Sequence, residues 1–214
     1  GDPGVGACEP RQRREIVVRC HRGPPVLNSP ADGHTLMVAP SNVVVTNQFL
    51  TDKPPFDPLK EFVPVTLLVD VPLVFSVSSK LPHSTLRELI DHIRTNPGKL
   101  NFASPGPGTP PHLAGELFTR AAGLSAVHVP YKGAAAAATD LFANEVQLMS
   151  IGYASLRGQI QGNLVRPIAV AASQRLAALP NVPTVVESGF AAIDAELNRS
   201  WWGLFAPRGT PRSE

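Results

Sequence analysis

The chain has 214 residues, of which 43% are hydrophobic and only 17% are charged, and its formal net charge is +2. This length and apolar content suffice for one large domain or two small lobes, and so weak a charge argues against a nucleic-acid-binding surface. The apolar runs are much shorter than the about 20 residues that a membrane span needs.

The first 30 residues differ in composition from the rest of the chain. Five arginines surround one short apolar pair, Val17-Val18, without helical or strand periodicity. We expect a solvated leader here, and a basic RNA-binding arm is the weaker alternative because no aromatic residue lies among the charges. Cys8, Cys20 and His21 are too few for a recognisable metal site, so we expect neither a metal nor a cofactor. No signal peptide is recognisable after Gly1.

From Ala31 onward, short apolar runs alternate with amphipathic segments and with turns rich in proline and glycine. Such alternation predicts βαβ units, a mostly parallel sheet and an α/β fold. Capping boxes mark the segments that begin at Thr85 and Thr184. The predicted strands cover 35–39, 62–69, 73–77, 100–103, 146–150, 166–172 and 201–206, and the predicted helices cover 85–96, 110–121 and 134–142.

The most informative segment is the loop Ser104–Thr109, which follows an apolar run and leads into a helix. Thr109 is in position to be the N-cap, and Pro110 fits the first helical position. Glycine amides and the positive end of a helix dipole form an anion site, so the loop suits a carboxylate or a phosphate. A plain turn is the alternative, and a Walker-type nucleotide site is unlikely because no Gly-Lys-Ser/Thr follows. Ser41-Asn42 forms a second polar loop at the carboxyl end of a strand, where ligands bind in open sheets.

Nothing in the sequence argues for catalysis. The histidines are scattered, and neither a nucleophile motif nor a zinc motif is present. His112 lies at a helix start and could line a cleft, although a hydrogen-bonded structural histidine is the simpler interpretation. We therefore expect no catalytic residue and no enzyme.

Many segments in one order resemble the Bug-type extracytoplasmic solute receptors of tripartite tricarboxylate transporters. They extend over about residues 30–209 and include Pro30-Ala31-Asp32-Gly33-His34-Thr35-Leu36, Pro55-Phe56-Asp57-Pro58-Leu59, His112-Leu113-Ala114-Gly115-Glu116-Leu117-Phe118, His128-Val129-Pro130-Tyr131-Lys132-Gly133 and Ser200-Trp201-Trp202-Gly203-Leu204-Phe205-Ala206-Pro207.

The resemblance implies a fold like that of type II periplasmic binding proteins, with two α/β lobes joined by a hinge. Residues 31–72 and 201–214 would form a remnant of lobe 1, 73–200 would form lobe 2, and 1–30 would be an unmatched Arg-rich leader. It also implies a periplasmic protein, a monomer in its intact form, that captures a small organic acid for a membrane permease. No nucleic-acid partner and no cofactor are expected.

The resemblance places the ligand between two loops. The residues implied in binding are Ser41, Asn42, Ser104, Gly106, Gly108, Thr109 and Ile151. Ile151 stands where many members carry an aspartate, which argues against a ligand with an ammonium group. Pro105 and Pro107 have no N–H, so the loop keeps only the amides of Gly106, Gly108 and Thr109 as expected donors.

The sequence departs from the family at both ends. The first strand, the Pro-Pro-Gly-Gly loop of the other carboxylate grip, and the C-terminal helices that complete lobe 1 are not matched. We therefore expect an incomplete first lobe, truncated at both ends, with weakened binding. Two alternatives stay open: a small α/β enzyme that uses the loop and His112 as acid or base, and a remnant without function.

Overall fold

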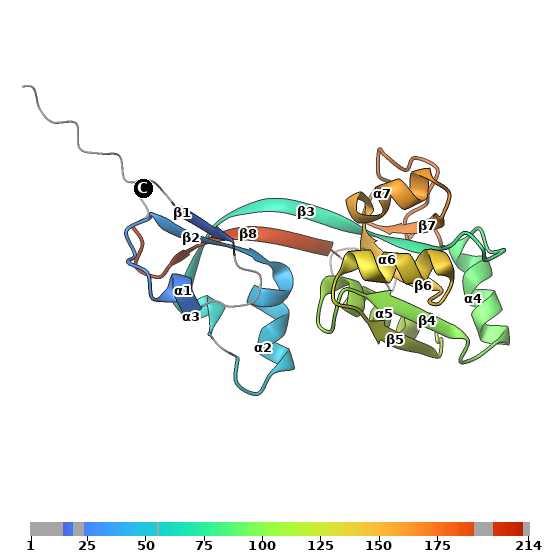
Figure 1. Ribbon diagram of the computed structural model, residues 1–214, viewed down its shortest axis with the longest axis horizontal. Helices are drawn as coiled ribbons and strands as arrows, with labels where there is room; N and C mark the ends of the chain where they lie inside the picture. The colour runs from blue at the N-terminus through green and yellow to red at the C-terminus, as the bar shows by residue number, and fades with distance from the viewer. Residues whose placement is uncertain (1–14, 19–23, 55, 191–198, 212–214) are drawn as a thin grey trace, which may run out of the picture.

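A long two-stranded ribbon joins the two halves of the molecule (Figure 1). Its strands are β3 (Phe62–Ser78) and β8 (Arg199–Pro207), which pair antiparallel from Phe62 opposite Pro207 to Pro72 opposite Arg199. The computed structural model describes residues 15–18, 24–54, 56–190 and 199–211. The chain therefore forms a smaller and a larger lobe that share strand β3.

Strand β3 is continuous where the sequence predicts two strands broken at residues 70–72. Up to Pro72 it pairs with β8, and from Leu73 onward it pairs with β6 and β7 instead. The predicted break is wrong because a proline removes only one backbone donor from a strand, and Pro72 lies where β3 exchanges its partners.

The smaller lobe is built on a sheet in the order β1-β2-β8-β3. Strand β1 pairs parallel with β2, and β2 pairs antiparallel with β8. Its core contains Met37, Val43, Phe56 and Phe62. The elements not yet named are β1 (Glu15–Val18), α1 (Pro24–Leu27), β2 (Thr35–Pro40), the π-helix η1 (Asn42–Thr46), α2 (Asn47–Leu50) and α3 (Pro58–Glu61).

Strand β1 corrects the expectation for the first 30 residues. The sequence predicts no strand around Val17-Val18, but Glu15–Val18 pairs with Thr35–Val38. Four residues carry too little periodicity to be recognised, and β2 supplies the hydrogen bonds. Cys8, Cys20 and His21 lie outside the described residues.

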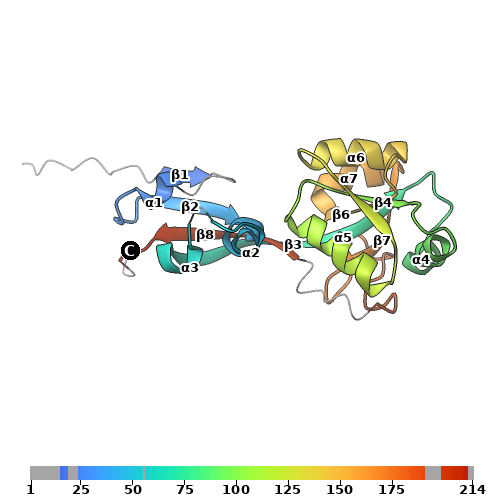
Figure 2. The same cartoon turned by 90° about the horizontal axis from the view of Figure 1, so that it is seen from below.

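The larger lobe has helices on both faces of its sheet (Figure 2). Its elements are α4 (Leu86–Thr95), β4 (Leu100–Ser104), α5 (Pro110–Ala121), β5 (Ala126–Pro130), α6 (Ala134–Ala143), β6 (Leu148–Gly152), α7 (Tyr153–Gln161) and β7 (Val165–Ala171). Phe102 packs in one core with α4 and α5, whereas its neighbour Ala103 packs in the other with α6 and α7. This alternation along β4 is what a strand covered on both faces requires.

The sheet is mixed, which corrects the expectation of a mostly parallel sheet. Strand β4 pairs parallel with β5 and β6, but β3 pairs antiparallel with β6, β7 and β8. The antiparallel pairs arise at β3 and β8, the two strands that connect the lobes. The parallel part, β5-β4-β6, keeps three carboxyl ends at one edge, and that edge carries the loop Ser104–Thr109.

The capping box at α4 is confirmed in a shifted form. The Thr85 hydroxyl accepts a hydrogen bond from the Glu88 N–H at 3.2 Å, and the Glu88 carboxylate accepts one from the Ser84 N–H at 2.7 Å. The partner of Glu88 is thus one residue earlier than in the standard box. Within the described ranges, no helix is both long enough and apolar enough to cross a membrane.

Candidate functional site

The loop Ser104–Thr109 connects the carboxyl end of β4 to the first turn of α5. Gly106 and Gly108 have φ angles of +147° and +73°, which residues with a side chain rarely adopt. Pro110 and Pro111 carry no N–H, so His112 supplies the first backbone donor of the helix itself. The loop thus keeps its backbone close to the helix N-terminus at the sheet edge where ligands bind in α/β folds.

The three amide donors predicted for the loop already have partners in the loop or in the first turn of α5. The Gly106 N–H donates to the Ser104 hydroxyl at 3.2 Å, and the Gly108 N–H donates to Nδ1 of His112 at 3.1 Å. The Thr109 N–H donates to the Gly106 carbonyl at 3.4 Å, a long bond. A carboxylate on this loop must therefore exchange with these partners, and the binding role of the loop stays a prediction.

Thr109 occupies the predicted N-cap position of α5 but does not cap the helix with its side chain. Its hydroxyl instead donates to the Gly106 carbonyl at 2.7 Å. The threonine therefore closes the loop on itself, and the N-terminus of α5 is left without a side-chain cap.

Two histidines support the loop. The structural, hydrogen-bonded role expected for His112 is confirmed by its bond from Gly108, whereas the contact made by His128 was not predicted. Nε2 of His128, on β5, lies 2.7 Å from Oγ of the fully buried Ser104. The His128 and His112 rings lie 4.0 Å apart between centroids. Burial and the nearby His112 imidazole lower the pKa of His128. The contact of His128 with Ser104 follows from the parallel register of β4 and β5, which places His128 beside Phe102. This register cannot be read from a single sequence.

Ser150 is a further residue that the sequence analysis missed. Its buried hydroxyl donates to the carbonyl of Pro111 at 2.9 Å and so ties β6 to the first turn of α5. Ile151, the next residue of β6, is buried with 6% of its surface exposed. Because β6 and β4 are parallel, Ile151 lies at the same sheet edge as the loop.

Ser41 and Asn42 lie in the smaller lobe, where β2 ends and a helical segment begins. Both are buried, and no described residue hydrogen-bonds to the Ser41 hydroxyl. An unpaired buried hydroxyl costs free energy and suits a polar ligand or a water molecule. Neither side chain hydrogen-bonds to the loop Ser104–Thr109 in the described structure, so the structure does not join the two predicted halves of the site.

One contact between the lobes is nevertheless made at the loop. A Cβ atom placed on Gly108 would overlap the side chain of Leu50, the last residue of α2. Leu50 therefore covers the Gly108 backbone, which is buried. The smaller lobe thus touches the larger lobe at one of the predicted binding residues.

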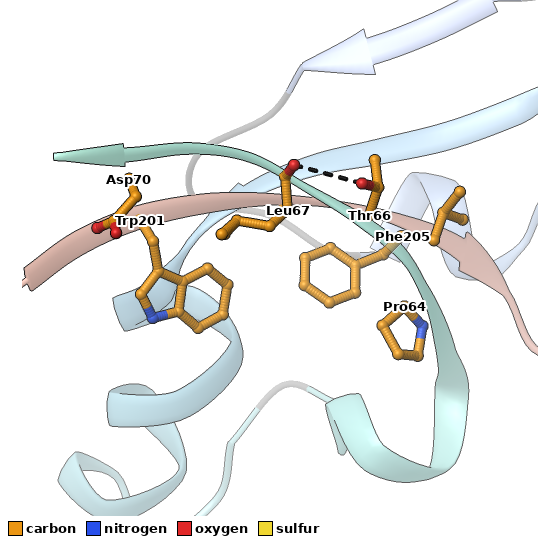
Figure 3. Close-up of a pocket in the computed structure, with 8 residues that line it drawn as sticks. Pro64, Thr66, Leu67, Asp70, Trp201 and Phe205 are labelled. Atoms are coloured by element: carbon orange, nitrogen blue, oxygen red, sulfur yellow. Dashed lines mark hydrogen bonds between the residues drawn. The ribbon is translucent and has the colours of Figure 1, made fainter. Parts of the chain in front are cut away.

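A separate hollow of about 450 Å³ lies on the ribbon, away from the predicted site residues (Figure 3). Its apolar wall includes Leu67, Trp201 and Phe205, and Asp70 is its one carboxylate in this lining. None of the predicted site residues lines this hollow, so we place the candidate anion site at the loop instead. Among the described residues, no group of three or more His, Cys, Asp or Glu could hold a metal ion.

A family comparison decides which proteins this chain is related to. The profile described as "Tripartite tricarboxylate transporter family receptor" matches residues 24–213. The chain belongs to this receptor family. The match begins inside the 1–30 stretch that the sequence analysis left unmatched.

Individual members of the receptor family show the same relationship. A Pseudomonas protein, "UPF0065 protein in tcbD-tcbE intergenic region", is 38% identical over 188 residues, which are 88% of this chain and 55% of that protein. Protein BugT of Bordetella pertussis is 32% identical over 183 residues, or 85% of this chain and 55% of BugT. The chain therefore spans about half the length of these curated relatives.

Solved structures of the receptor family share the fold. "R. palustris Rpa4515 with adipate" has a TM-score of 0.80 and 31% identity over 88% of this chain and 62% of its own. MatC from Rhodopseudomonas palustris, solved with bound malate, has a TM-score of 0.72 and 28% identity over 88% of this chain and 63% of its own. The predicted fold class, a periplasmic-binding-protein fold with an incomplete first lobe, is confirmed.

Proposed function

We propose that this chain captures a small organic acid in the periplasm for the membrane permease of a tripartite tricarboxylate transporter. The observation that carries the proposal is the glycine loop Ser104–Thr109 at the N-terminus of α5. Two related receptors with this fold were solved with the dicarboxylates adipate and malate. The periplasmic location and the permease partner come from the family relationship alone.

In the proposed complex, the larger lobe holds a carboxylate on the loop and the smaller lobe closes over it. The proposed lobes are 31–72 with 201–214, and 73–200, and the hinge lies where β3 passes between them. The buried Ser41 hydroxyl and Asn42 are the polar groups that the smaller lobe would contribute. The contact of Leu50 with Gly108 supports this closure because it already joins the lobes at the loop.

The site favours a plain carboxylate over an amino acid. Ile151 places a buried apolar side chain at the sheet edge of the loop, and an ammonium group there would lack a charged partner. Malate and aspartate form a matched pair for this question, because they differ only in a hydroxyl in place of an ammonium group. We expect malate to bind more tightly.

An enzymatic role has one observation in its favour, the 2.7 Å contact of Ser104 with His128, which resembles a nucleophile and its base. Ser104 is fully buried, however, and its hydroxyl also contacts both backbone groups of Gly106. The arrangement therefore serves loop structure better than nucleophilic attack, and we propose a receptor without catalysis.

A thermal-shift titration tests the proposal. Adipate and malate are compared with 1,6-hexanediol, which has the chain of adipate without its charges. A ligand at about 100 times its dissociation constant stabilises the folded state by about 2.7 kcal/mol. We expect a saturable shift with a dicarboxylate and none with the diol, whereas equal shifts, or none with any acid, would contradict capture of a carboxylate.

Ser104→Ala locates the binding on the loop. It removes the hydroxyl that joins both backbone groups of Gly106 to His128, so the loop should lose its ordered shape and the acid-induced shift should fall. The matched control is Ser76→Ala, because Ser76 is equally buried in the larger lobe but lies on β3, outside the loop. Equal ligand shifts in both variants would place the binding elsewhere.

A further inference from the structure

Two neighbouring imidazoles lie directly beside the proposed anion loop. His112 comes from the first turn of α5 and His128 from β5, and their rings are tilted by 36° with centroids 4.0 Å apart. The Phe102 ring stacks on both, at 6.4 Å from His112 and 4.9 Å from His128. The pair is therefore held in one orientation by its neighbours.

The loop is closed by a hydrogen bond that only an unprotonated nitrogen can accept. The Gly108 N–H donates to Nδ1 of His112, so this nitrogen carries a lone pair and the ring proton resides on Nε2. Protonation of Nδ1 removes the acceptor and releases the Gly108 amide. Ser104 and His128 differ, because a hydroxyl can either donate to or accept from Nε2.

The two rings are close enough for their charges to interact. Two positive rings with centroids 4.0 Å apart would repel each other, so a proton on one ring disfavours a proton on the other. Glu116, one turn further along α5, has its Oε1 atom 3.8 Å from Nε2 of His112.

The strands packed against α5 add no charge to the pair. Strands β4 and β6 contain no titratable side chain, and in β5 only His128 titrates. The side chains described for β8, from Ser200 onward, do not titrate either. Helix α4 shares a core with α5, but its titratable side chains are all exposed: Arg87, Glu88, Asp91, His92 and Arg94.

We propose that the His112–His128 pair couples capture of a carboxylate to uptake of one proton. The incoming carboxylate takes the Gly108 N–H in place of Nδ1, and the freed Nδ1 accepts a proton from solvent. The resulting imidazolium lies beside the carboxylate and compensates its charge. This inference rests on the proposed function and names how the same site is regulated.

The burial of the loop explains why compensation is needed. Gly108 is buried and covered by Leu50, so an uncompensated carboxylate there would lose its hydration without gaining an opposite charge. In the described loop, no lysine or arginine hydrogen-bonds to its residues. The imidazoles are therefore the groups already in contact with the loop that can become cationic.

Calorimetric titration of the full chain with adipate tests the proposal. Titrations in buffers of different ionisation enthalpy give the number of protons taken up with each adipate. At about pH 7 to 8, above the ordinary imidazole pKa, we expect the uptake to approach one proton per adipate. The affinity should rise by up to about tenfold for each pH unit of acidification. Adipate binding without proton uptake, and with the same affinity at each pH, would overturn the proposal.

Three variants separate positioning from simple structural support. His112→Asn places an amide oxygen near Nδ1, so it keeps an acceptor for Gly108 but cannot take up a proton. It should bind adipate with no pH dependence, whereas His112→Ala should also lose loop order. The control is His92→Asn, because His92 is exposed, lies on α4 outside the loop, and belongs to a second imidazole pair, with the His83 ring at 4.3 Å between centroids.

Imidazole resonances of the unmodified chain give a readout that needs no variant. Addition of adipate at pH 7 should move the His112 signals toward the protonated form, while the His92 signals stay unchanged. If adipate binds and the His112 signals do not change, the proposal is wrong although the proposed function stands. If neither adipate nor malate binds at any pH, both fail.

Discussion

The two lobes differ in how completely their sheets are covered. In the larger lobe, helices pack on both faces, and the two main cores lie on either side of the sheet. In the smaller lobe, the helices are short and the described core is a single cluster. Eight of the twelve large hydrophobic side chains that are exposed in the described chain belong to the smaller lobe or its half of the ribbon: Val45, Phe49, Leu50, Leu59, Val65, Leu67, Leu68 and Val69.

The two halves of strand β3 also differ in how far their apolar side chains are buried. In the larger lobe, Leu73 and Val77 are at most 1% exposed, whereas Val65 and Leu67 in the smaller lobe are 54% and 57% exposed. The residue types are alike, so the difference lies in what packs on them. An apolar strand pattern indicates a surface suited to burial, and the neighbours decide whether burial occurs.

The largest expected effect comes from the core of the larger lobe. Phe118→Ala removes a fully buried ring that packs on Phe75 at 5.4 Å between centroids and should lower the free energy of unfolding by about 3–5 kcal/mol. Urea unfolding, followed by circular dichroism, measures the loss. Phe62→Ala makes the same deletion in the smaller lobe, next to Phe56.

If the lobes differ as described, Phe62→Ala should leave the main transition in place and weaken only an earlier, smaller one. Equal shifts of one shared transition in both variants would show that the lobes unfold as a single unit.

The next effect tests the packing beneath the loop. A Cβ on Gly115 would overlap the ring of Phe102, which also stacks on both histidines of the pair. Gly115→Ala should therefore destabilise the protein by about 1–3 kcal/mol, measured by thermal unfolding. Gly158→Ala is the control, since a Cβ there meets no atom within 4 Å and alanine favours the helix α7. If Gly115→Ala left the thermal stability unchanged, tight packing of Gly115 against Phe102 would be contradicted.

Acidification should weaken the larger lobe by a smaller amount. Burial and the His112 imidazole lower the pKa of His128 in the folded chain, so the unfolded chain binds more protons just below pH 6.5. Stability should therefore decrease as the pH falls from about 7 to 5, by less than about 1.4 kcal/mol per pH unit.

His128→Gln should flatten part of this pH dependence in thermal unfolding scans. It should not remove all of it, because burial also lowers the pKa of His83. A His128→Gln profile that parallels the unmodified chain between pH 7 and 5 would contradict the role given to His128.

The smallest effect on stability is expected at the exposed apolar side chains of β3 in the smaller lobe, which are Val65, Leu67, Leu68 and Val69. Leu67→Lys should change the free energy of unfolding by less than about 0.5 kcal/mol, because the side chain is mostly exposed. It should reduce concentration-dependent association, since exposed apolar strands promote pairing between molecules. Light scattering after gel filtration measures this.

Leu164→Lys is the control for Leu67→Lys, with an isolated leucine of the larger lobe that is 47% exposed. If both variants changed association equally, the exposed side chains of β3 would have no special role in association.

Local features of the fold were predictable from the sequence, and features that depend on distant partners were not. The strand–loop–helix unit at Ser104 and the helix after Thr85 follow from short-range capping and periodicity, and both are confirmed. Strand β1 and the unbroken β3 depend on pairing with β2 and β8, which no local pattern reveals.

The candidate site shows the same limit. The loop and its glycines were found from their residue types, but the partners of its amides were not. The acceptor for Gly108 is a side chain four residues ahead, and the support of Ser104 comes from His128 on a neighbouring strand. Whether Ser41 and Asn42 join this loop in a complex depends on lobe closure, and their role stays a prediction.

An amide NMR titration with adipate shows whether the loop Ser104–Thr109 binds a carboxylate. We expect the Gly106, Gly108 and Thr109 signals to move together and saturate, while Gly98 and Gly123, which lie in turns away from the loop, stay fixed. Shifts confined to the indole of Trp201 on the ribbon hollow, or no saturable shift at all, would contradict a carboxylate site on the loop.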